Sequence, residues 1–370
     1  MTTLDTPDTP FAVVDADRVD RNAARLRERL DGLGVPLRLH VKTCKSVDVA
    51  ARVREGGPIT VSTLAEAEHF ADAGYRDVLY AVGLDPHKLP RVAALTRRGV
   101  TLTVLLDSLA QAEALQGFAA EENLRVPALI EIDCDGHRGG VQVDDPVLVQ
   151  IGRALGANLA GVLTHAGESY FAYTPEALRQ AAQHERDVAV AAAEALRTNG
   201  LSCGIVSVGS TPTAHAATDL SGVTEVRAGN YVFFDLVMAG IGVCGTDDLA
   251  LSVVVTVIGH RPDQNWVLTD GGWMATSRDR GTQAQAVDQG YGLVADVHGE
   301  LIAGLLMTGA SQEHGVLSTR DGSPVPDLPI GTRLRILPNH ACATAAQHDR
   351  YQVVRGSDEI EAVWPRLRGW

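Results

Sequence analysis

The stretch "LAGVLTHA" (159–166) is followed by "TPEALRQAAQHERDVAVAAAEALRTNG" (174–200) and then by "GIVSVGS" (204–210). The first and third segments are short and rich in Val, Ile and Leu, as buried parallel strands are. The long segment between them has a helical pattern. A strand, a helix and a second strand in this order predict a β–α–β unit, in which the two strands run parallel.

The same alternation recurs from about residue 15 to residue 235. Six more candidate strands share it, at 36–43, 58–62, 77–83, 101–107, 127–133 and 224–230. Eight such strands with helices between them predict an α/β fold, a (β/α)8 barrel of the TIM type. A doubly wound open sheet is the alternative. A helix expected over "ADRVDRNAARLRERLDGLG" precedes the first strand, which departs from the simplest barrel.

The pattern changes after about residue 245, where strand-like segments follow one another with little helix between them. These segments are "LALSVVVTVIGH", "NWVLTDGG", "GYGLVADVHG", "LIAGLLMTG", "HGVLST" and "TRLRILPNHA". They predict a second, mainly antiparallel β domain. We therefore expect a barrel over 15–240 and a β domain over 241–370, which "FAVVDAD" and the rest of 1–14 could join.

Composition excludes several classes of protein. The 370 residues carry 32 basic against 46 acidic side chains, a formal net charge of −14, and no basic stretch stands out. This argues against nucleic acid or an anionic membrane surface as the main partner, although a small anionic ligand remains possible. No stretch approaches the roughly 20 apolar residues that cross a bilayer. The acidic N-terminus lacks the basic start of a secretory signal, and the five scattered cysteines do not form a disulfide framework. We expect a reduced, cytoplasmic protein.

Two lysines lie three residues apart in "RLHVKTCKS" (38–46), just after the first barrel strand. Alternate residues of a strand share a face, so Arg38, His40 and Lys42 should point the same way. Active-site groups of barrels lie at the carboxyl ends of the strands. Lys42 is expected at that end and Lys45 beyond it, so Lys42 is the candidate nucleophile. An ion-paired surface lysine is the simpler alternative.

Two later segments suggest a phosphate site. "VSVGSTPT" (206–213) ends a strand with small hydrogen-bonding residues, including Ser210 and Thr211, although a simple helix cap would explain them nearly as well. "EVRAGNYVFFD" (225–235) brings Arg227 and Gly229 to the end of the next strand. Phosphate often binds barrels at the loops after the last two strands, and these are those loops.

His165 and Arg138 follow two other strands on the same rim. A lone histidine at a strand end is more often structural than catalytic. Here it would join a reactive lysine and a phosphate anchor in one barrel mouth. That combination is what pyridoxal 5′-phosphate requires.

The motifs "HVKTCKS", "THAGESY", "VGSTPT", "RAGNYVFFD", "DQGYGLVAD", "SQEHG" and "PNHACAT" together resemble the D-threonine aldolase and D-serine dehydratase family, over nearly the whole chain and in the same order. These are pyridoxal-phosphate enzymes with a barrel similar to that of alanine racemase. The resemblance implies that Lys42 forms the Schiff base and that the cofactor contacts His165, Tyr170, Arg138, Ser210, Thr211, Arg227, Gly229 and Asn230. It also implies a homodimer and a D-configured 3-hydroxy amino acid as the substrate. Cys44 stands where the family often has histidine.

His340 and Cys342 in "PNHACAT" suggest a metal site. Two residues apart on a strand they would share a face, and imidazole with thiolate suits zinc. A His-x-Cys pair also arises easily by chance, but the resemblance implies a divalent metal at these positions. Zinc is expected, with Mn²⁺ or Mg²⁺ as alternatives.

The bond that breaks decides the activity. A metal that binds the β-hydroxyl would favour dehydration to a 2-oxo acid and ammonia, whereas loss of the hydroxyl proton would favour aldol cleavage to glycine and an aldehyde. A His/Cys pair is typical of the dehydratases in this family, so we expect a lyase of the dehydratase type. The aldolase is the main alternative. A racemase, with Tyr291 as second acid, and a non-enzymatic cofactor carrier are lesser ones.

Two further segments are ambiguous. "DGGWMATSRDRGT" (270–282) could lie at the barrel mouth and contact a substrate carboxylate, or could form a hairpin with a solvated charged tip. Glu313 and His314 could support the metal or form a simple turn.

Overall fold

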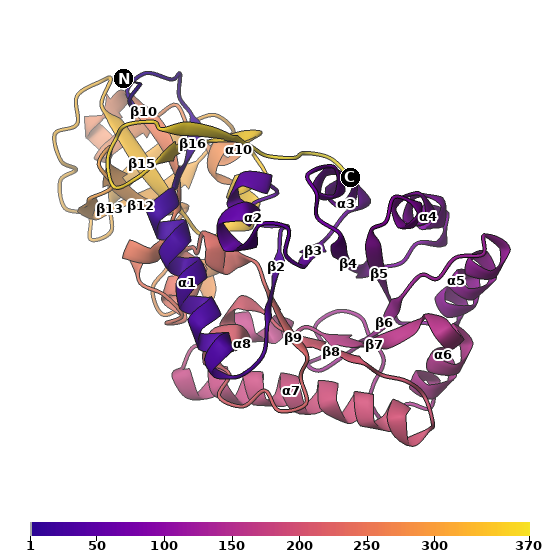
Figure 1. Cartoon of the computed structure of the whole chain (residues 1–370). Coiled ribbons are helices and arrows are strands. Elements are labelled where there is room, and N and C mark those ends of the chain that lie inside the picture. The colour runs from indigo at the N-terminus through magenta and orange to yellow at the C-terminus, as the bar shows by residue number, and fades with distance from the viewer. Residues whose placement is uncertain (1) are drawn as a thin grey trace. The chain divides into compact units, whose positions relative to one another are not determined.

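The computed structural model of the chain describes residues 2–370 and divides into two compact units (Figure 1). One unit, the barrel unit, comprises Ala24–Gly229 and Gly369–Trp370. The other, the β unit, comprises Met1–Ala23 and Asn230–Arg368. The first boundary falls inside helix α1 (Ala16–Gly32).

The barrel unit contains eight parallel strands that close on themselves. In order they are β2 (Leu37–His40), β3 (Ile59–Val61), β4 (Asp77–Gly83), β5 (Thr101–Leu106), β6 (Ala128–Ile132), β7 (Leu159–Thr164), β8 (Ile205–Val208) and β9 (Glu225–Ala228). The last strand pairs with the first, in the register Arg38 with Arg227. This closure confirms the predicted (β/α)8 barrel and excludes the open sheet.

Helices follow the strands as expected (Figure 1). They are α2 (Val47–Arg54), α3 (Leu64–Asp72), α4 (Leu89–Arg97), α5 (Leu109–Glu121), α6 (Val147–Leu155), α7 (Pro175–Thr198) and α8 (Thr211–Ala216). Helix α7 begins at Pro175, as the sequence pattern predicts. Thr174 caps it by accepting a hydrogen bond from the N–H of Ala177, and Pro175 occupies the first turn, where its missing N–H costs nothing.

The barrel strands carry two different kinds of side chain. Leu79, Leu105, Leu129 and Leu163, one from each of β4 to β7, form an apolar cluster. On β2 and β9, by contrast, Arg38 donates a hydrogen bond to Glu225 at 2.8 Å. Charged side chains can be buried here because each provides the other with a hydrogen-bond partner. The polar side of the barrel is therefore the side formed by β2 and the last strands.

The β unit contains one nine-stranded sheet, and all but one of its pairings are antiparallel, as predicted. Its strands, in sheet order, are β11 (Trp266–Thr269), β14 (Gly315–Thr319), β13 (Leu301–Ala310), β12 (Gly292–Asp296), β15 (Arg333–Pro338), β10 (Leu251–Arg261), β1 (Phe11–Asp15), β16 (Arg350–Val354) and β17 (Ala362–Pro365). Strand β1 pairs antiparallel with β10 and parallel with β16. Three valines of β10, Val253, Val255 and Val257, pack with Ile336 and Met307 in the core on one face.

Short helices interrupt the β unit. They are α9 (Leu236–Gly240), α10 (Trp273–Thr276) and α11 (Ala341–Ala345). Short 3-10 segments occur in both units, at Pro86–Lys88, Gly156–Asn158, Gly167–Phe171, Asn230–Val232, Thr246–Asp248, Pro262–Gln264 and Gly281–Ala284. No helix within residues 2–370 combines the length and the apolar character that crossing a bilayer requires.

Candidate active site

The lysine segment differs from the expected geometry in one respect. Strand β2 ends at His40, so Lys42 lies in the turn beyond the strand rather than at its last position. The N–H of Lys42 points back to Nδ1 of His40 at 3.4 Å, and the N–H of Lys45 bonds to the carbonyl of Val41 at 2.7 Å. The chain therefore turns tightly at Lys42 while keeping it at the carboxyl end of the barrel.

The chain contains only three lysines, and two of them are committed to partners. Lys45 forms an ion pair with Glu66 at 3.0 Å, and the Glu66 side chain is fully buried. The amine of Lys88 donates to the hydroxyl of Tyr80 at 3.0 Å. Lys42 makes no ion pair with any carboxylate in residues 2–370. Of the two lysines in "KTCK", Lys42 is the one whose amine is available.

Two half-buried histidines accompany Lys42. Burial, followed by the nearby charge of Lys42, holds the pKa of His40 well below its usual value. Burial and Lys42 likewise lower the pKa of His165 to about 3, with smaller contributions from Arg227 and Arg138. Nδ1 of His165 lies 3.0 Å from the carbonyl oxygen of Gly209. A carbonyl only accepts, so Nδ1 carries the proton of a neutral ring.

Arg227 is a buried cation held without a direct carboxylate partner. It donates to the hydroxyl of Ser207 at 2.7 Å and to the carbonyl of Thr164 at 2.6 Å. Burial lowers its pKa to about 10, against the opposing charges of Glu225 and Glu185, so it remains charged at neutral pH. The Ser207 hydroxyl in turn donates to Glu225 at 2.6 Å. Arg227 is thereby fixed in position, and the other N–H groups of its guanidinium remain available to a ligand.

The turn after β8 combines a helix cap with an unsatisfied hydroxyl. Ser210 and Thr213 form a capping box at the start of α8, so the simple helix-cap interpretation is correct as far as Ser210 is concerned. Ser210 also lies 2.9 Å from the hydroxyl of Ser169. The hydroxyl of Thr211 is buried and has no hydrogen-bond partner among residues 2–370. A buried hydroxyl without a partner is costly, which marks this turn as a place for a polar ligand.

Two glycines on this rim allow a close approach of backbones. A Cβ on Gly209, whose φ is +134°, would lie 2.2 Å from the carbonyl oxygen of Arg227. A Cβ on Gly229 would lie 2.6 Å from the carbonyl oxygen of His40. Any other residue at either position would push apart the strand ends that carry Lys42, Ser210 and Arg227.

Glu185 is a site residue that the sequence analysis missed. It lies on α7, 2% exposed, and accepts hydrogen bonds from the N–H groups of Ala166 at 2.9 Å and Gly209 at 3.0 Å. It therefore ties the segment after His165 to the segment before Ser210. Its position gives a signal in the sequence, because a glutamate on the alanine-rich buried face of a helix needs an explanation.

Three further predicted site residues, Tyr170, Arg138 and Asn230, differ in their surroundings. The ring of Tyr170 lies 6.5 Å from that of His165, and Arg138, more exposed, pairs with Glu131 at 3.2 Å. Glu131, Arg138 and His165 line one small cavity. Asn230 belongs to the β unit, where it donates to Asp235.

The predicted metal pair lies in the β unit, on a different local structure from the one expected. Strand β15 ends at Pro338, His340 is the N-cap of α11, and Cys342 lies in the first turn of that helix. The prediction that both lie on one strand is wrong, since Ala341 starts a helix. Their side chains are nevertheless hydrogen-bonded to each other. The pair is therefore brought together by a helix start instead of by strand alternation.

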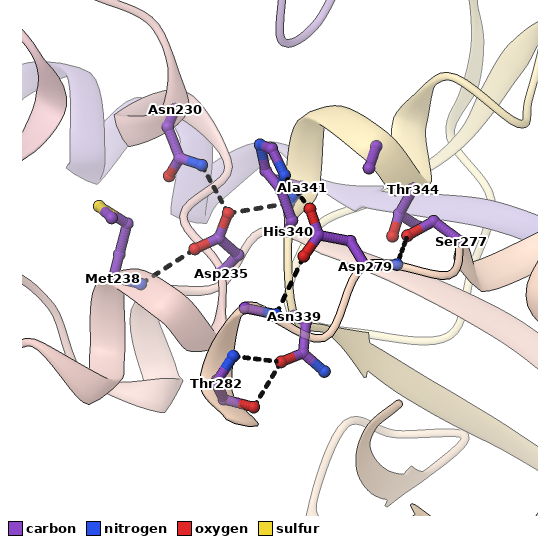
Figure 2. A network of polar contacts seen from close by, with 12 residues as sticks. Asn230, Asp235, Met238, Ser277, Asp279, Thr282, Asn339, His340, Ala341 and Thr344 are labelled. Carbon is purple, nitrogen blue, oxygen red and sulfur yellow. Dashed lines mark hydrogen bonds and ion pairs between the residues drawn. The ribbon is translucent and has the colours of Figure 1, made fainter. Parts of the chain in front are cut away.

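Asp279 holds His340 in place, as Figure 2 shows. Its carboxylate lies 2.6 Å from Nδ1 of His340. Although burial opposes it, the charge of Cys342 and the hydrogen bond to Asp279 raise the pKa of His340 to about 11. A carboxylate on one imidazole nitrogen fixes the ring and leaves the other nitrogen to a metal.

Asp235 supports the same segment from within the β unit. It is fully buried and accepts hydrogen bonds from Asn230, from the N–H of Met238 at 3.0 Å and from the N–H of Ala341 at 2.8 Å (Figure 2). The oxygen of the Asn230 amide is buried without a partner. Asp235 thus anchors the start of α11, where His340 and Cys342 lie.

Within residues 2–370 no group of three or more His, Cys, Asp or Glu side chains is arranged to hold a metal. His340 and Cys342 would therefore be two protein ligands that leave other positions open. Glu313 and His314 form the turn between β13 and β14, where the N–H of Ser311 bonds to the carbonyl of His314 at 2.8 Å, so the simple-turn interpretation is correct for them. Residues 270–282 form α10 and a turn, not a hairpin.

Comparison with known proteins covers the whole chain. Residues 14–237 match the alanine racemase N-terminal domain, and residues 250–354 match a serine dehydratase domain. The chain is 56% identical to D-threo-3-hydroxyaspartate dehydratase of Delftia sp. (strain HT23), over 100% of this chain and 99% of that protein. It is 28% identical to D-serine dehydratase of Dictyostelium discoideum, over 95% and 94% of the two chains.

Solved structures are similar to this chain as well. The solved structure of the Delftia enzyme, at 56% identity, superimposes with a TM-score of 0.97, covering 100% of both chains. A cysteine-to-alanine variant of that enzyme has been solved in a metal-free form. Alanine racemase of Clostridium difficile 630, at 14% identity, gives a TM-score of 0.68 over 97% of this chain and 98% of the other. This match shows a similar fold only.

Proposed function

Because the chain belongs to the family of pyridoxal-phosphate-dependent lyases that joins an alanine racemase N-terminal domain to a serine dehydratase domain, we propose that it dehydrates D-3-hydroxy amino acids to a 2-oxo acid and ammonia. D-threo-3-hydroxyaspartate is the first candidate substrate, followed by D-serine and D-threonine. The observation that carries the proposal is the available amine of Lys42 at the carboxyl end of a barrel, beside two neutral histidines and a buried arginine.

The barrel residues fit pyridoxal 5′-phosphate. Lys42 would hold the cofactor covalently, and the unpartnered hydroxyl of Thr211, with Ser210 and the backbone near Gly229, would hold its phosphate. The neutral ring of His165 would lie against the pyridine ring, and Arg227 would face its nitrogen. Tyr170 and Arg138 are the outer members of this proposed set.

When bound, pyridoxal 5′-phosphate supplies an aldehyde that bonds to amines and a ring that stabilises negative charge at Cα. The amine of Lys42 would be the base that removes the Cα proton. His165 and His40 are neutral in this environment, so neither adds positive charge beside the Lys42 amine. Arg227 keeps its own proton and its fixed position because Ser207 and Thr164 hold its guanidinium.

His340 and Cys342 fit a divalent metal, which would act as a Lewis acid on the β-hydroxyl and make it a better leaving group. The anionic surroundings of the pair, Asp279 and Asp235, suit a cation. The variants of the Delftia enzyme that have been solved changed a histidine and a cysteine two positions apart, the same spacing as His340 and Cys342. Zinc is the expected ion, with Mn²⁺ or Mg²⁺ as alternatives.

Aldol cleavage is the second candidate, because the related proteins include 3-hydroxy-D-aspartate aldolase and D-threonine aldolase at lower identity. Products separate the two reactions. On D-threo-3-hydroxyaspartate we expect oxaloacetate and ammonia, lost on chelation and restored by zinc. Glycine and glyoxylate would establish the aldolase instead, and the absence of both product pairs with all three substrates would contradict the proposal.

We also propose a cytoplasmic homodimer. Within residues 2–370 the five cysteines form no disulfide with one another, which is typical of a reducing compartment. Light scattering of the purified protein measures the mass directly, and a monomer would contradict the second half of this proposal.

A further inference from the structure

We propose that Arg278 is the specificity-determining residue that binds the second, β-carboxylate of a dicarboxylate substrate. This inference rests on the proposed function, because it concerns which 3-hydroxy amino acid the dehydratase prefers. It follows from three features of residues 273–280: an uncommitted guanidinium, an aromatic surface that supports it, and a strained turn that ties it to the metal pair.

Arg278 is a cation without an anionic partner. Its guanidinium carbon lies 5.2 Å from the ring centre of Trp273, and this stacking is its one polar or cationic contact within residues 2–370. The neighbouring Arg280, by contrast, is paired with Asp288 at 2.6 Å and lies over the ring of Tyr291. An arginine stacked on an aromatic ring keeps its five N–H donors free in the plane of the guanidinium. Arg278 is therefore held ready for an anion.

The next residue in the chain holds the proposed metal ligand. Asp279 lies 2.6 Å from Nδ1 of His340. Helix α10, which contains Trp273, is joined to α11, which contains Cys342, by the hydrogen bond from the Thr344 hydroxyl to the carbonyl of Thr276. The segment that presents Arg278 is thus attached to the metal pair at both ends.

The backbone between Trp273 and Asp279 is strained. Ser277 has φ +85° and ψ 162°, a conformation that is almost restricted to glycine and costs on the order of 1–3 kcal/mol. Ser277 is buried, and its hydroxyl accepts the N–H of Asp279 at 3.1 Å. Strained backbone of this kind persists only where the surrounding structure holds it. Here the conformation of Ser277 sets the directions in which the side chains of Arg278 and Asp279 point.

The charges of the segment explain why a cation is placed here. Asp279 and Asp235 surround His340, and the whole chain carries a net charge of −14, so a dianionic substrate would be repelled without a local counter-charge. Arginine binds carboxylates through two parallel hydrogen bonds, which lysine cannot do. D-Serine and D-threonine lack the second carboxylate, so the guanidinium of Arg278 has nothing to bind in them.

The test compares Arg278→Gln and Arg278→Lys with Arg261→Gln. Arg261 is an exposed arginine of the same unit, paired with Asp263, and controls for the loss of a positive charge. The readout is kcat/KM of the holoenzyme for D-threo-3-hydroxyaspartate, D-serine and D-threonine. For R278Q we expect a roughly 10- to 100-fold loss with hydroxyaspartate, mostly in KM, and less than about a threefold change with D-serine. R278K should recover part of the loss, and R261Q should resemble the wild type.

Two results with R278Q would overturn the assignment: equal losses with all three substrates, which would make Arg278 structural, or no loss with hydroxyaspartate. A wild-type enzyme that dehydrates D-serine but not hydroxyaspartate would also overturn it while leaving the proposed function standing. A wild-type enzyme without activity on any of the three would instead contradict the proposed function.

Discussion

Lys42 differs from the other two lysines of the chain only in its surroundings. Lys45 neutralises a buried glutamate, and Lys88 binds a tyrosine hydroxyl, whereas the charge of Lys42 acts on two imidazoles, those of His40 and His165. Lys42 is therefore the lysine that forms no ion pair with a carboxylate of residues 2–370 and remains available as a nucleophile.

Reduction of the cofactor-loaded protein with borohydride tests this difference. We expect the cofactor to be fixed on the peptide that contains Lys42, and Lys42→Ala to abolish the labelling. Lys88→Gln is the matched control and should be labelled like the wild type, because its amine is held by Tyr80. Mass spectrometry of the digested protein gives the answer, and a label on Lys45 or Lys88 would refute the assignment.

His165 makes the cofactor-free protein sensitive to acid. Its pKa is about 3 in the folded chain, against about 6.5 for an exposed histidine, so the unfolded state binds a proton first as the pH falls. The folded state therefore loses stability below pH 6.5, down to about pH 3. Between pH 7 and pH 5 we expect the wild type to lose about 2 kcal/mol more unfolding free energy than His165→Asn. Urea titrations at the two pH values measure this, and parallel losses would contradict it.

At the scale of elements, α7 connects two parts of the barrel site through Glu185. Glu185→Ala would leave two buried N–H groups, those of Ala166 and Gly209, without an acceptor, at about 1–3 kcal/mol each. We expect lower stability and a weaker affinity for pyridoxal 5′-phosphate, with a smaller change for pyridoxal, because the turn that carries Ser210 would shift. Absorbance titrations with both compounds measure the affinities.

Two variants control this experiment. Glu185→Gln keeps an oxygen acceptor and should recover most of the affinity, which a simple volume effect would not predict. Glu194→Ala, on the exposed face of the same helix and paired with Arg197, should behave like the wild type. An equal effect of Glu185→Ala on both cofactor forms would show that the carboxylate does not act through the phosphate turn.

The elements also explain which features the sequence could predict. The eight barrel strands follow from short Val/Ile/Leu segments with helices between them. Seven of them lie within two residues of their expected bounds, and β2 ends three residues earlier than expected. The local structure of His340 and Cys342 could not be predicted, because the start of a five-residue helix depends on Asp235, more than 100 residues earlier in the chain. The contact of Asp279 with His340 could not be predicted for the same reason, since the two residues are 61 positions apart.

At the scale of the whole molecule, the two units divide the proposed chemistry. The barrel unit would contribute the amine, the histidines and the proposed phosphate-binding turn, and the β unit would contribute the proposed metal pair, His340 and Cys342, with its supporting carboxylates. Neither group of residues would support dehydration alone, because the first lacks a Lewis acid and the second lacks a way to activate Cα. The family assignment agrees, since its two component domains match these two parts of the sequence.

Strand β1 has a consequence for how the protein is made. Its residues are synthesised before the barrel, yet both of its neighbours in the sheet, β10 and β16, are synthesised only after the entire barrel. Until then the apolar segment "FAVV" has no strand edge to pair with and can pair with the wrong strands. The nascent chain must therefore keep β1 unpaired while the barrel is made, and β10 and β16 complete the sheet around it afterwards.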